Sequence, residues 1–203
     1  MTGGANTRFG AALARAESAD IHVPSFGSKS RVLRLQRGLT LEQLAAGTGL
    51  SKGHLSRFER GEKTLSIAAL MRVSQALGTS VAALLGEGRS EAAYHLVRAG
   101  EGTPRAAPAE DGGYAYTALS RAGESGGLST FLVELPAEGS RTGEVAHAGE
   151  EGFLVLTGRV EVDLEDETIL LGPGDYLQFS GTLRHKVRSF EGASRILIVV
   201  AAG

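Results

Sequence analysis

The chain has 203 residues, of which 42% are hydrophobic and 22% charged, as expected for an ordinary globular protein. It contains no cysteine, which excludes disulfides and thiolate metal sites. No apolar run approaches the roughly 20 residues that span a bilayer, and the N-terminus lacks the apolar core of a signal peptide. We therefore expect a cytoplasmic protein with no membrane partner.

The net charge of −2 conceals an asymmetry along the chain. Residues 29–86 carry nine basic and three acidic groups, a balance of +6. Residues 87–203 carry ten basic and eighteen acidic groups, a balance of −8, and residues 1–28 carry two of each. A compact basic segment is what binding to a phosphate backbone requires, so residues 29–86 are the candidate for a nucleic-acid contact.

Residues 1–25 have no sustained hydrophobic period, and we expect them to form a flexible arm. The alternative is an arm that contacts the minor groove or a partner through its two cations, Arg8 and Arg15. From Ser28 the pattern becomes helical and ends at Gly38. The cations of this first helix surround Val32, Leu33 and Leu35, and they are Lys29, Arg31, Arg34 and Arg37.

Residues 40–61 carry the spacing of two short helices joined by a tight turn. Thr40 can cap the first helix, and Gly49 admits the positive φ that the reversal of the chain requires. Ser51 can cap the second helix, which extends to about Arg60. The apolar positions that face a shared core are Leu44, Leu50, Leu55 and Phe58. This is the pattern of a helix-turn-helix.

The second helix of this pair carries cations and hydroxyls on the side that faces away from the core. Charged residues opposite a buried stripe are normal for any surface helix, but the paired helices, the small-residue turn and the clustered cations favour DNA binding. Gly53, at the centre of this face, offers no side chain to a base. We therefore predict base contacts from Lys52, His54, Ser56 and Arg57, and phosphate contacts from Thr40, Ser51 and Arg60.

Three segments of this region fit the pattern of the phage-repressor type of helix-turn-helix regulator, often called XRE-like. They are residues 31–40, 45–51 and 55–61, and the resemblance covers about residues 26–86. It implies that the helix starting at Ser51 enters the major groove of a double-stranded DNA operator while the preceding helix crosses the phosphate backbone. Two further helices, opened by Ser66 and Ser80, complete a predicted five-helix domain over residues 26–86.

Residues 87–92 are rich in glycine and charge, and we place the linker between two domains there. Over residues 93–203 the hydrophobic period changes from about 3.6 to 2, which indicates an all-β sandwich or barrel. The predicted fold class is thus a two-domain α plus all-β protein. The predicted strands are 94–98, 114–120, 130–135, 152–156, 159–164, 168–171, 176–179, 185–190 and 195–200.

The spacing of histidine, glutamate and glycine in the second domain resembles the cupin family. The first cupin motif is matched at His147, Glu151 and Gly158, and the second at Gly174 and His185. The resemblance implies a double-stranded β-helix barrel. The departures from the family pattern are Val145 at the first histidine position and Ser180, Thr182 and Ser189 in the second motif.

His147 and Glu151 are four residues apart, so strand alternation places both on one face. With His185 they would supply the two imidazoles and one carboxylate of a site for a divalent metal such as Fe, Zn, Mn or Ni. The alternative is that the domain does not bind a metal, because Val145 replaces the first histidine of the family pattern. His147 and His185 would then line an effector pocket. Other candidates for such a pocket are Tyr114, Tyr116, Tyr176 and Gln178, which could instead only fill the core.

The two resemblances together imply a DNA-binding transcriptional regulator whose cupin-like domain senses a small-molecule effector. Cupin domains commonly pair through their sheets, so we expect a homodimer that matches two half-sites about 34 Å apart. The alternative is a non-haem metal enzyme that resembles hydroxypropylphosphonate epoxidase, which has the same order of domains. That family uses a lysine of its helical domain near the substrate, and residues 36–38, the corresponding region, contain none.

Overall fold

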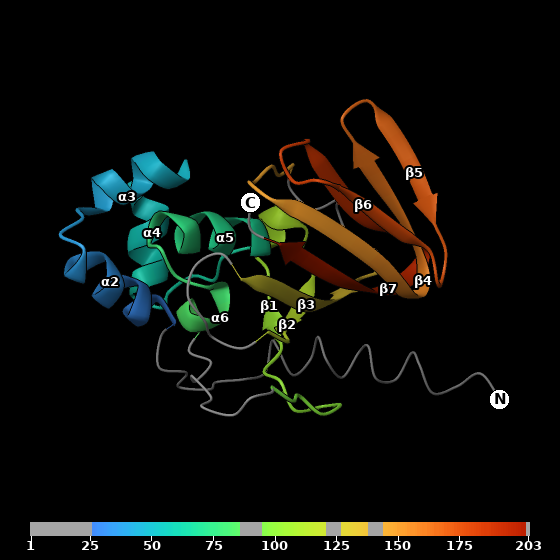
Figure 1. The fold of residues 1–203 in the computed structure, drawn as a ribbon, viewed down its shortest axis with the longest axis horizontal. Helices are drawn as coiled ribbons and strands as arrows, with labels where there is room; N and C mark the ends of the chain where they lie inside the picture. The colour runs from blue at the N-terminus through green and yellow to red at the C-terminus, as the bar shows by residue number, and fades with distance from the viewer. Residues whose placement is uncertain (1–25, 86–94, 121–126, 138–143, 202–203) are drawn as a thin grey trace.

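The helices and the strands of this protein lie in separate parts of the chain (Figure 1). The computed structural model describes residues 26–85, 95–120, 127–137 and 144–201. The arm predicted over residues 1–25 and the linker predicted over residues 87–92 lie outside these ranges.

The N-terminal domain contains the five predicted helices within the described part of the chain, which confirms this part of the fold. They are α2 (Phe26–Gln36), α3 (Leu41–Thr48), α4 (Lys52–Glu59), α5 (Ile67–Ala76) and α6 (Val81–Leu84). Their buried core includes the inward positions of the predicted helix pair, Leu44, Leu55 and Phe58. The 3.6-residue period of the sequence therefore identified the faces that pack together.

Helices α3 and α4 begin at the predicted capping residues, and the predicted glycine ends α3. Thr40 and Gln43 form a capping box, in which the Thr40 hydroxyl accepts a hydrogen bond from the Gln43 backbone and the Gln43 side chain accepts one from the Thr40 backbone. Gly49 ends α3 with φ of 68°, a left-handed conformation that glycine adopts without strain. The Ser51 hydroxyl accepts a hydrogen bond from the His54 backbone and so starts α4.

A buried ion pair joins α2 to the C-terminal end of α4. Arg34 donates from Nε and Nη2 to the two carboxylate oxygens of Glu59 at 2.7 and 2.8 Å, and its Nη1 donates to the Leu39 carbonyl at 2.8 Å. In the sequence, Arg34 is one of four cations around Val32, Leu33 and Leu35. The structure buries Arg34, which is 6% exposed, and leaves Val32 and Leu35 53% and 57% exposed.

The described strands form one antiparallel sheet, in which β6 pairs with β4 beside the order β1-β2-β3-β7-β4-β5. The strands are β1 (Arg105–Ala106), β2 (Ala115–Ala118), β3 (Leu128–Leu135), β4 (Glu150–Leu164), β5 (Glu167–Leu171), β6 (Tyr176–Ser180) and β7 (His185–Ala201). A 3-10 turn, η1 (Ala109–Asp111), precedes β2. The inner face of the sheet buries Phe131, Val133, Phe153, Val155, Ile196 and Ile198.

Two pairs of predicted strands are each one long strand. Residues 152–156 and 159–164 both belong to β4, because the glycine between them forms a β-bulge and not a turn. Gly158 has φ of 74°, and a Cβ there would lie 2.5 Å from the Ser194 hydroxyl of β7. Residues 185–190 and 195–200 likewise both belong to β7. The strand predicted over 94–98 was wrong, since residues 95–98 form no strand.

Helix α5 lies between the other helices and the sheet (Figure 1). The Tyr114 hydroxyl accepts a hydrogen bond from the Ile67 backbone at 3.2 Å, and the Tyr116 hydroxyl donates to the Leu65 carbonyl at 3.1 Å. Both tyrosines are buried and belong to the same hydrophobic cluster as Leu70 of α5. The start of α5 is thus held by β2, and the cores of the two domains are continuous.

The ion pair of Arg34 yields a prediction about stability. Arg34→Met would leave the Glu59 carboxylate buried without its partner, and we expect the free energy of unfolding to fall by about 3–5 kcal/mol. Urea denaturation followed by circular dichroism measures this loss.

The control is Arg31→Met, which removes an exposed cation of the same helix and should change stability by no more than about 0.5 kcal/mol. The double change Arg34→Met with Glu59→Leu should recover much of the loss, because it removes both charges. Equal losses for Arg31→Met and Arg34→Met would show that the ion pair does not hold these helices together.

Candidate functional site

Helix α4 and the residue that caps it present most of the predicted DNA contacts to solvent. Ser51, Lys52, Arg57 and Arg60 are exposed, and Ser56 is half-buried beside them. At Gly53 the position of a Cβ is open space, so no side chain crowds this point of the helix. Thr40, at the start of α3, is also exposed. The sequence-predicted contacts therefore gather on one surface, with the exception of His54.

Two cations of this surface are held by neighbouring side chains. Lys52 forms an ion pair with Glu42 of α3, and Arg60 contacts Glu62 and the Ser56 hydroxyl. These groups are exposed, and such surface pairs are weak and screened by salt. Phosphate oxygens of DNA can therefore replace the carboxylates. Arg57 forms no ion pair with any residue in the described ranges.

The structure places His54, a predicted base contact, against the second domain. Its ring is half-buried, and its Nε2 is buried without a hydrogen-bond partner among the described residues. Burial lowers the pKa of His54, and the charge of Lys63 lowers it further, whereas Asp111 of η1 acts in the opposite direction. Lys63 also forms an ion pair with Glu110 of the same turn. His54 therefore lies where α4 meets η1.

Three side chains predicted to bind a metal converge inside the sheet domain. His147 Nε2 lies 3.0 Å from Glu151 Oε2, and His185 Nε2 lies 2.9 Å from the same oxygen. The three side chains are 3%, 5% and 4% exposed. Glu151 comes from β4 and His185 from the start of β7, so two strands far apart in the sequence bring them together.

Hydrogen bonds at the other ring nitrogens orient both imidazoles. His185 Nδ1 lies 2.8 Å from the Leu183 carbonyl, and His147 Nδ1 lies 3.1 Å from the Ala148 carbonyl. A carbonyl only accepts hydrogen bonds, so each Nδ1 carries a proton. In the neutral imidazole each Nε2 is then an unprotonated lone pair that faces the Glu151 carboxylate. That arrangement is repulsive unless a proton or a metal ion lies between them.

The donor set fits a divalent metal ion. Ligand atoms about 2.1 Å from a metal and at right angles to each other are about 3.0 Å apart, which matches the two distances to Glu151. Backbone carbonyls that hold the far nitrogen of a histidine are the usual outer partners of metal-binding imidazoles. Two imidazoles and a carboxylate suit Fe, Zn, Mn or Ni. A bound ion would supply positive charge and open coordination positions for a ligand.

The ionisation of these groups reflects their mutual contacts. Burial raises the pKa of Glu151, but hydrogen bonds to His147 and His185 outweigh it and lower the pKa below its ordinary value. Burial lowers the pKa of His147, but the hydrogen bond and the charge of Glu151 outweigh it and raise the pKa. Without a metal, a proton on an imidazole therefore takes the position between these groups. Metal binding must displace that proton.

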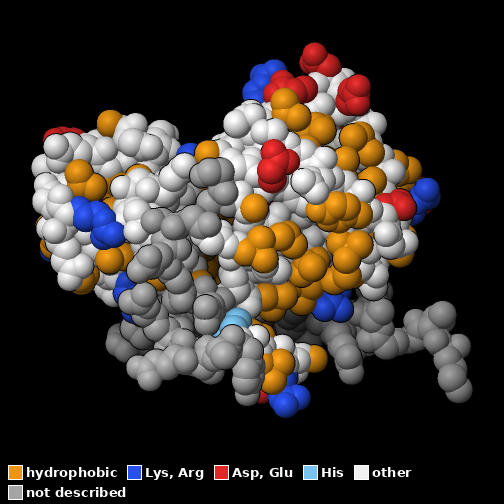
Figure 2. Space-filling model, in the orientation of Figure 1, with side chains coloured by type: hydrophobic (Ala, Val, Ile, Leu, Met, Phe, Trp, Pro, Cys, Tyr) orange, Lys and Arg blue, Asp and Glu red, His pale blue; other side chains and the backbone are white. Residues whose placement is uncertain are grey.

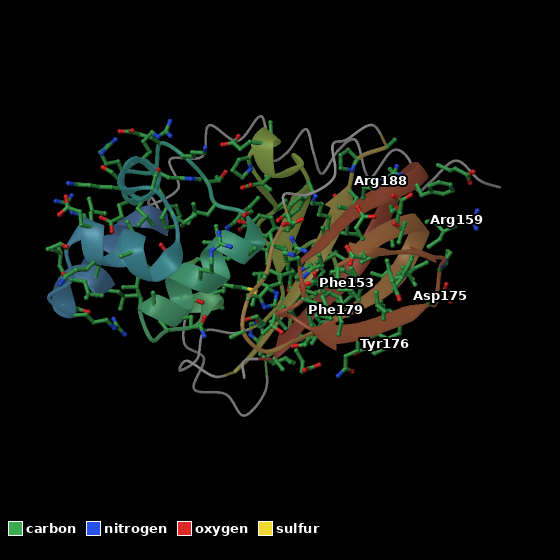
Figure 3. All side chains as sticks on the ribbon, turned by 90° about the horizontal axis from the view of Figure 1, so that it is seen from above. Phe153, Arg159, Asp175, Tyr176, Phe179 and Arg188 are labelled. Carbon is green, nitrogen blue, oxygen red and sulfur yellow. The ribbon has the colours of Figure 1, made fainter. Side chains whose placement is uncertain are left out.

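Apolar rings and close backbone packing surround the three ligands. Phe153 and Phe179 lie inside the sheet with ring centroids 5.2 Å apart, and the ring of Phe179 is 4.9 Å from that of His185 (Figure 3). Gly181 lies against His147, where a Cβ would be 2.5 Å from the imidazole. Sequence analysis missed Gly181, because only the folded chain brings this turn against His147. Such surroundings exclude water and strengthen charge interactions.

The other residues predicted to line an effector pocket lie in two different places. Tyr114 and Tyr116 are buried under α5, where their hydroxyls are bonded to the helical domain. Burial raises the pKa of Tyr114, and the charge of Glu151 acts in the same direction. Tyr176 and Gln178 are exposed and hydrogen-bonded to each other on the outer face of β6. The alternation of β6 turns Phe179, and not these two, toward Glu151.

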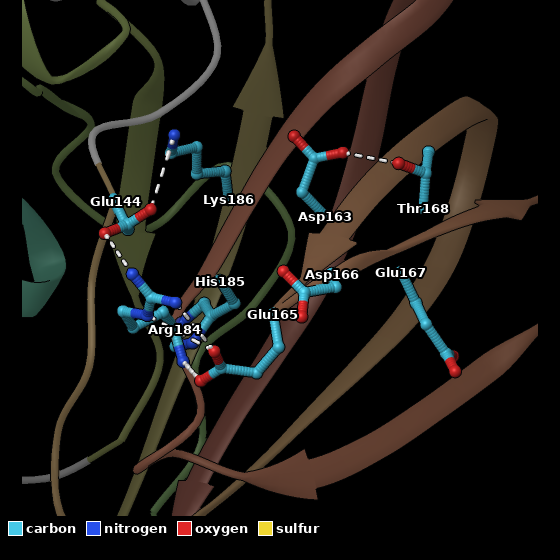
Figure 4. Close-up of a pocket in the computed structure, with 9 residues that line it drawn as sticks. All are labelled: Glu144, Asp163, Glu165, Asp166, Glu167, Thr168, Arg184, His185 and Lys186. Atoms are coloured by element: carbon cyan, nitrogen blue, oxygen red, sulfur yellow. Dashed lines mark hydrogen bonds and ion pairs between the residues drawn. The ribbon is translucent and has the colours of Figure 1, made fainter.

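A cavity of about 160 Å³ opens at the end of β4 and β7, beside the backbone of the second ligand histidine (Figure 4). Ion pairs cross its wall, from Arg184 to Glu165 and from Lys186 to Glu144. Its lining is Glu144, Asp163, Glu165, Asp166, Glu167, Thr168, Arg184, His185 and Lys186. Because its carboxylates are largely exposed, the cavity is distinct in character from the buried triad.

Comparison with known proteins finds a matching family for each of the two domains. The family described as Helix-turn-helix matches residues 31–84, and the family described as Cupin domain matches residues 131–200. A relative in Sinorhizobium fredii, the uncharacterised HTH-type transcriptional regulator y4dJ, is 41% identical over 54 residues. That match covers 27% of this chain and 70% of the relative.

Two solved structures match most of this chain. A helix-turn-helix family transcriptional regulator from Vibrio cholerae matches with a TM-score of 0.69 at 22% identity, over 91% of this chain and 99% of that chain. At this identity the likeness concerns the fold alone. Hydroxypropylphosphonic acid epoxidase from S. wedmorenis matches with a TM-score of 0.46 at 21% identity, over 88% of this chain and 98% of that one.

No helix in the described part of the chain is long and apolar enough to cross a membrane. The capped helix pair, the exposed cations of α4 and the matches of both domains agree with one another. The chain belongs to the XRE-type helix-turn-helix family of transcriptional regulators and carries a cupin domain after its DNA-binding domain.

Proposed function

We propose that this transcriptional regulator reads an operator through α4 as a homodimer, and that its cupin domain senses a small effector at a divalent metal held by His147, Glu151 and His185. The observation that carries the sensing part is the geometry of the triad. Both Nε2 atoms lie about one ligand-to-ligand distance from a single carboxylate oxygen, and both are fixed in the metal-binding tautomer.

The exposed surface of α4 supports operator reading. The end of the helix that would enter a major groove carries Lys52 and the small residue Gly53, and the cations Arg57 and Arg60 follow. Arg57 is free of ion pairs within the described residues and can form two hydrogen bonds with a guanine edge. The positive balance of residues 29–86 supplies the affinity for phosphates that does not depend on sequence.

An apolar outer face of the sheet supports a homodimer. The register places Leu132 of β3, Leu197 of β7, Leu154 of β4 and Tyr176 of β6 in one row across four strands. Val199 and Leu156 extend this row, and we call these six residues the outer face. Hydrophobic side chains gather over this part of the domain in Figure 2. A second copy of the protein would bury the outer face. The dimer would then present two α4 helices, one to each half-site of an operator.

The junction between α4 and η1 gives the sensing domain a route to the DNA. Lys63, close after α4, pairs with Glu110, and the His54 ring rests near Asp111. An effector that binds two arrangements of the cupin domain with unequal affinity would therefore shift the position of α4. Coupling of this kind amounts to about 1–3 kcal/mol in typical proteins.

The enzymatic alternative rests on the same triad, because two imidazoles and a carboxylate also serve non-haem metal enzymes. The exposed cations of α4 favour the regulator, since an enzyme would not require them. Measurements of metal content and of operator binding on one sample distinguish the two functions.

The first prediction here concerns the DNA-reading surface. Arg57→Ala should weaken binding to an operator selected from genomic fragments by about 1–3 kcal/mol, because a guanidinium contact to a base edge is lost. Fluorescence anisotropy at fixed salt measures this change. Arg159→Ala, which removes an exposed arginine of the cupin domain, is the matched control and should bind like the wild type. Unchanged binding by Arg57→Ala would contradict the assignment of the reading surface.

The second prediction concerns the metal. The wild type should bind a single equivalent of Co²⁺, and Glu151→Gln should lower the affinity at least about tenfold, since even loss of an outer partner costs 10–100-fold. Glu150→Gln changes the exposed neighbour on the opposite face of β4 and should have no effect. Visible absorption of bound Co²⁺ reports the binding.

The same titration has an expected pH dependence. The pKa of His147 is raised in the metal-free protein, so its proton competes with the metal over a wider range than that of a free imidazole. Affinity should fall as the pH is lowered through this raised pKa, so the fall should begin at a higher pH than for an ordinary imidazole. A flat profile, or equal loss in the Glu150→Gln and Glu151→Gln variants, would argue against the triad as the ligand set.

The third prediction concerns the dimer. Leu197→Glu places a charge at the centre of the outer face and should convert the protein to a monomer in sedimentation velocity. Operator affinity should fall about tenfold or more, because each copy then binds a half-site alone. Leu170→Glu, at an exposed leucine of β5 outside the outer face, is the control. A Leu197→Glu protein that remains dimeric would refute this interface.

A further inference from the structure

Residues 105–118, which comprise β1, η1 and β2 and which we call the docking hairpin, hold the helical domain by its backbone at two places. Tyr114 and Tyr116 are hydrogen-bonded to the backbone where α5 begins. Arg105 of β1 reaches another part of the domain, because its Nη2 donates to the Leu85 carbonyl, just after α6, at 3.2 Å (Figure 1). The start of α5 and the end of α6 are therefore both attached to the sheet.

These attachments are rigid because the side chains that make them are buried and packed. Tyr114, Tyr116 and Arg105 are all buried, and Arg105 lies opposite Tyr116 in the pairing of β1 with β2. The centroids of the two tyrosine rings are 6.0 Å apart, and the ring of Tyr116 lies 6.3 Å from that of Phe131 in β3. The helical domain therefore cannot turn on the sheet without breaking buried hydrogen bonds, which is costly.

The docking hairpin also lies next to the outer face. Strand β2 pairs with β3 so that Thr117 is opposite Leu132, a residue of the outer face. On the helical side, α5 packs on α3 and α3 packs on α4. In a dimer formed through the outer face, packed elements alone then connect the interface to each reading helix, in the order β3, β2, α5, α3 and α4. The protein itself would set the distance and the angle between the two α4 helices.

We propose that Tyr114, Tyr116 and Arg105 determine which spacing of operator half-sites the dimer accepts, because they fix the orientation of each DNA-reading domain on the sheet. This inference rests on the proposed function, since it takes the outer face as the dimer interface and α4 as the reading helix. It adds residues of the sheet domain that determine operator specificity without touching DNA.

The geometry of DNA makes spacing a sharp criterion. One added base pair moves the second half-site by about 3.4 Å along the DNA axis and rotates it by about 35° around that axis. Reading domains that turned freely on their sheets could follow this change, and the dimer would bind both spacings with similar affinity. Domains held by buried hydrogen bonds can follow only if those bonds break or the DNA deforms, and each costs free energy. The dimer should therefore accept one spacing.

The test compares binding of the full-length protein to an operator selected from genomic fragments and to two derivatives, with one base pair added or removed between the half-sites. Fluorescence anisotropy at fixed salt gives the affinities, and DNA with one half-site reports the reading domain alone. The wild type should bind each derivative about tenfold or more weakly than the operator. This ratio should fall about threefold or more in the double variant Tyr114→Phe with Tyr116→Phe, which loses both hydroxyls and keeps both rings. Half-site affinity should not change.

The control is Thr168→Val, which removes an exposed hydroxyl of β5 outside the outer face and the docking hairpin and should keep the wild-type ratio. Tyr116→Phe alone is a milder variant and should lower the ratio in the same direction. The ratio of the wild type tests the proposal without any variant.

Two results overturn the proposal. One is a wild-type dimer that binds all three spacings equally, and the other is a set of tyrosine variants that retain the wild-type ratio. A wild type that is monomeric in sedimentation velocity, or that binds no operator, would instead overturn the proposed function and this inference with it.

Discussion

The structure depends on the two hydrogen bonds by which β2 holds the start of α5. Tyr114 and Tyr116 are buried tyrosines whose hydroxyls need partners, and they find them in the backbone of Ile67 and Leu65. Because these bonds cross between the domains, α5 belongs to the core of the helices on one side and to the core of the sheet on the other. The cupin domain is therefore packed against the helical domain and is not joined to it by a linker alone. Helix α5 therefore connects the sheet that carries the triad to α3, the helix on which it packs.

Buried charges serve two different ends in the two domains. The pair of Arg34 and Glu59 is complete, since both carboxylate oxygens and three guanidinium nitrogens have partners. The pair holds α4 on α2 and needs no further binding partner. The group of His147, Glu151 and His185 is incomplete without a cation, because two lone pairs face one carboxylate. A buried ion pair whose atoms all have partners specifies the packing of the helices, whereas a buried cluster that lacks a partner is a candidate binding site.

Much of the fold could be predicted from local signals. The caps at Thr40 and Ser51 and the glycine of the turn act within four residues, so they are visible in the sequence. The burial of Arg34 could not be predicted, because its partner is 25 residues away and the helical period treats every arginine as a polar surface residue. Strand β4 was predicted as two strands because a glycine between two apolar runs, here Gly158, looks the same in the sequence whether it forms a turn or a bulge. The three side chains of the triad were predicted from their motif spacing, but Gly181 belongs to no motif.

The sequence by itself determined the two-domain order, the helix pair, the cation-bearing face of α4 and the identity of the three candidate ligands. These depend on period, capping and spacing, which are properties of neighbouring residues. Only the tertiary structure decided which histidine nitrogens face Glu151, and that His54 lies near η1. Each of these depends on the packing of segments far apart in the chain, and that packing follows from how the two cores fit together and not from any local pattern.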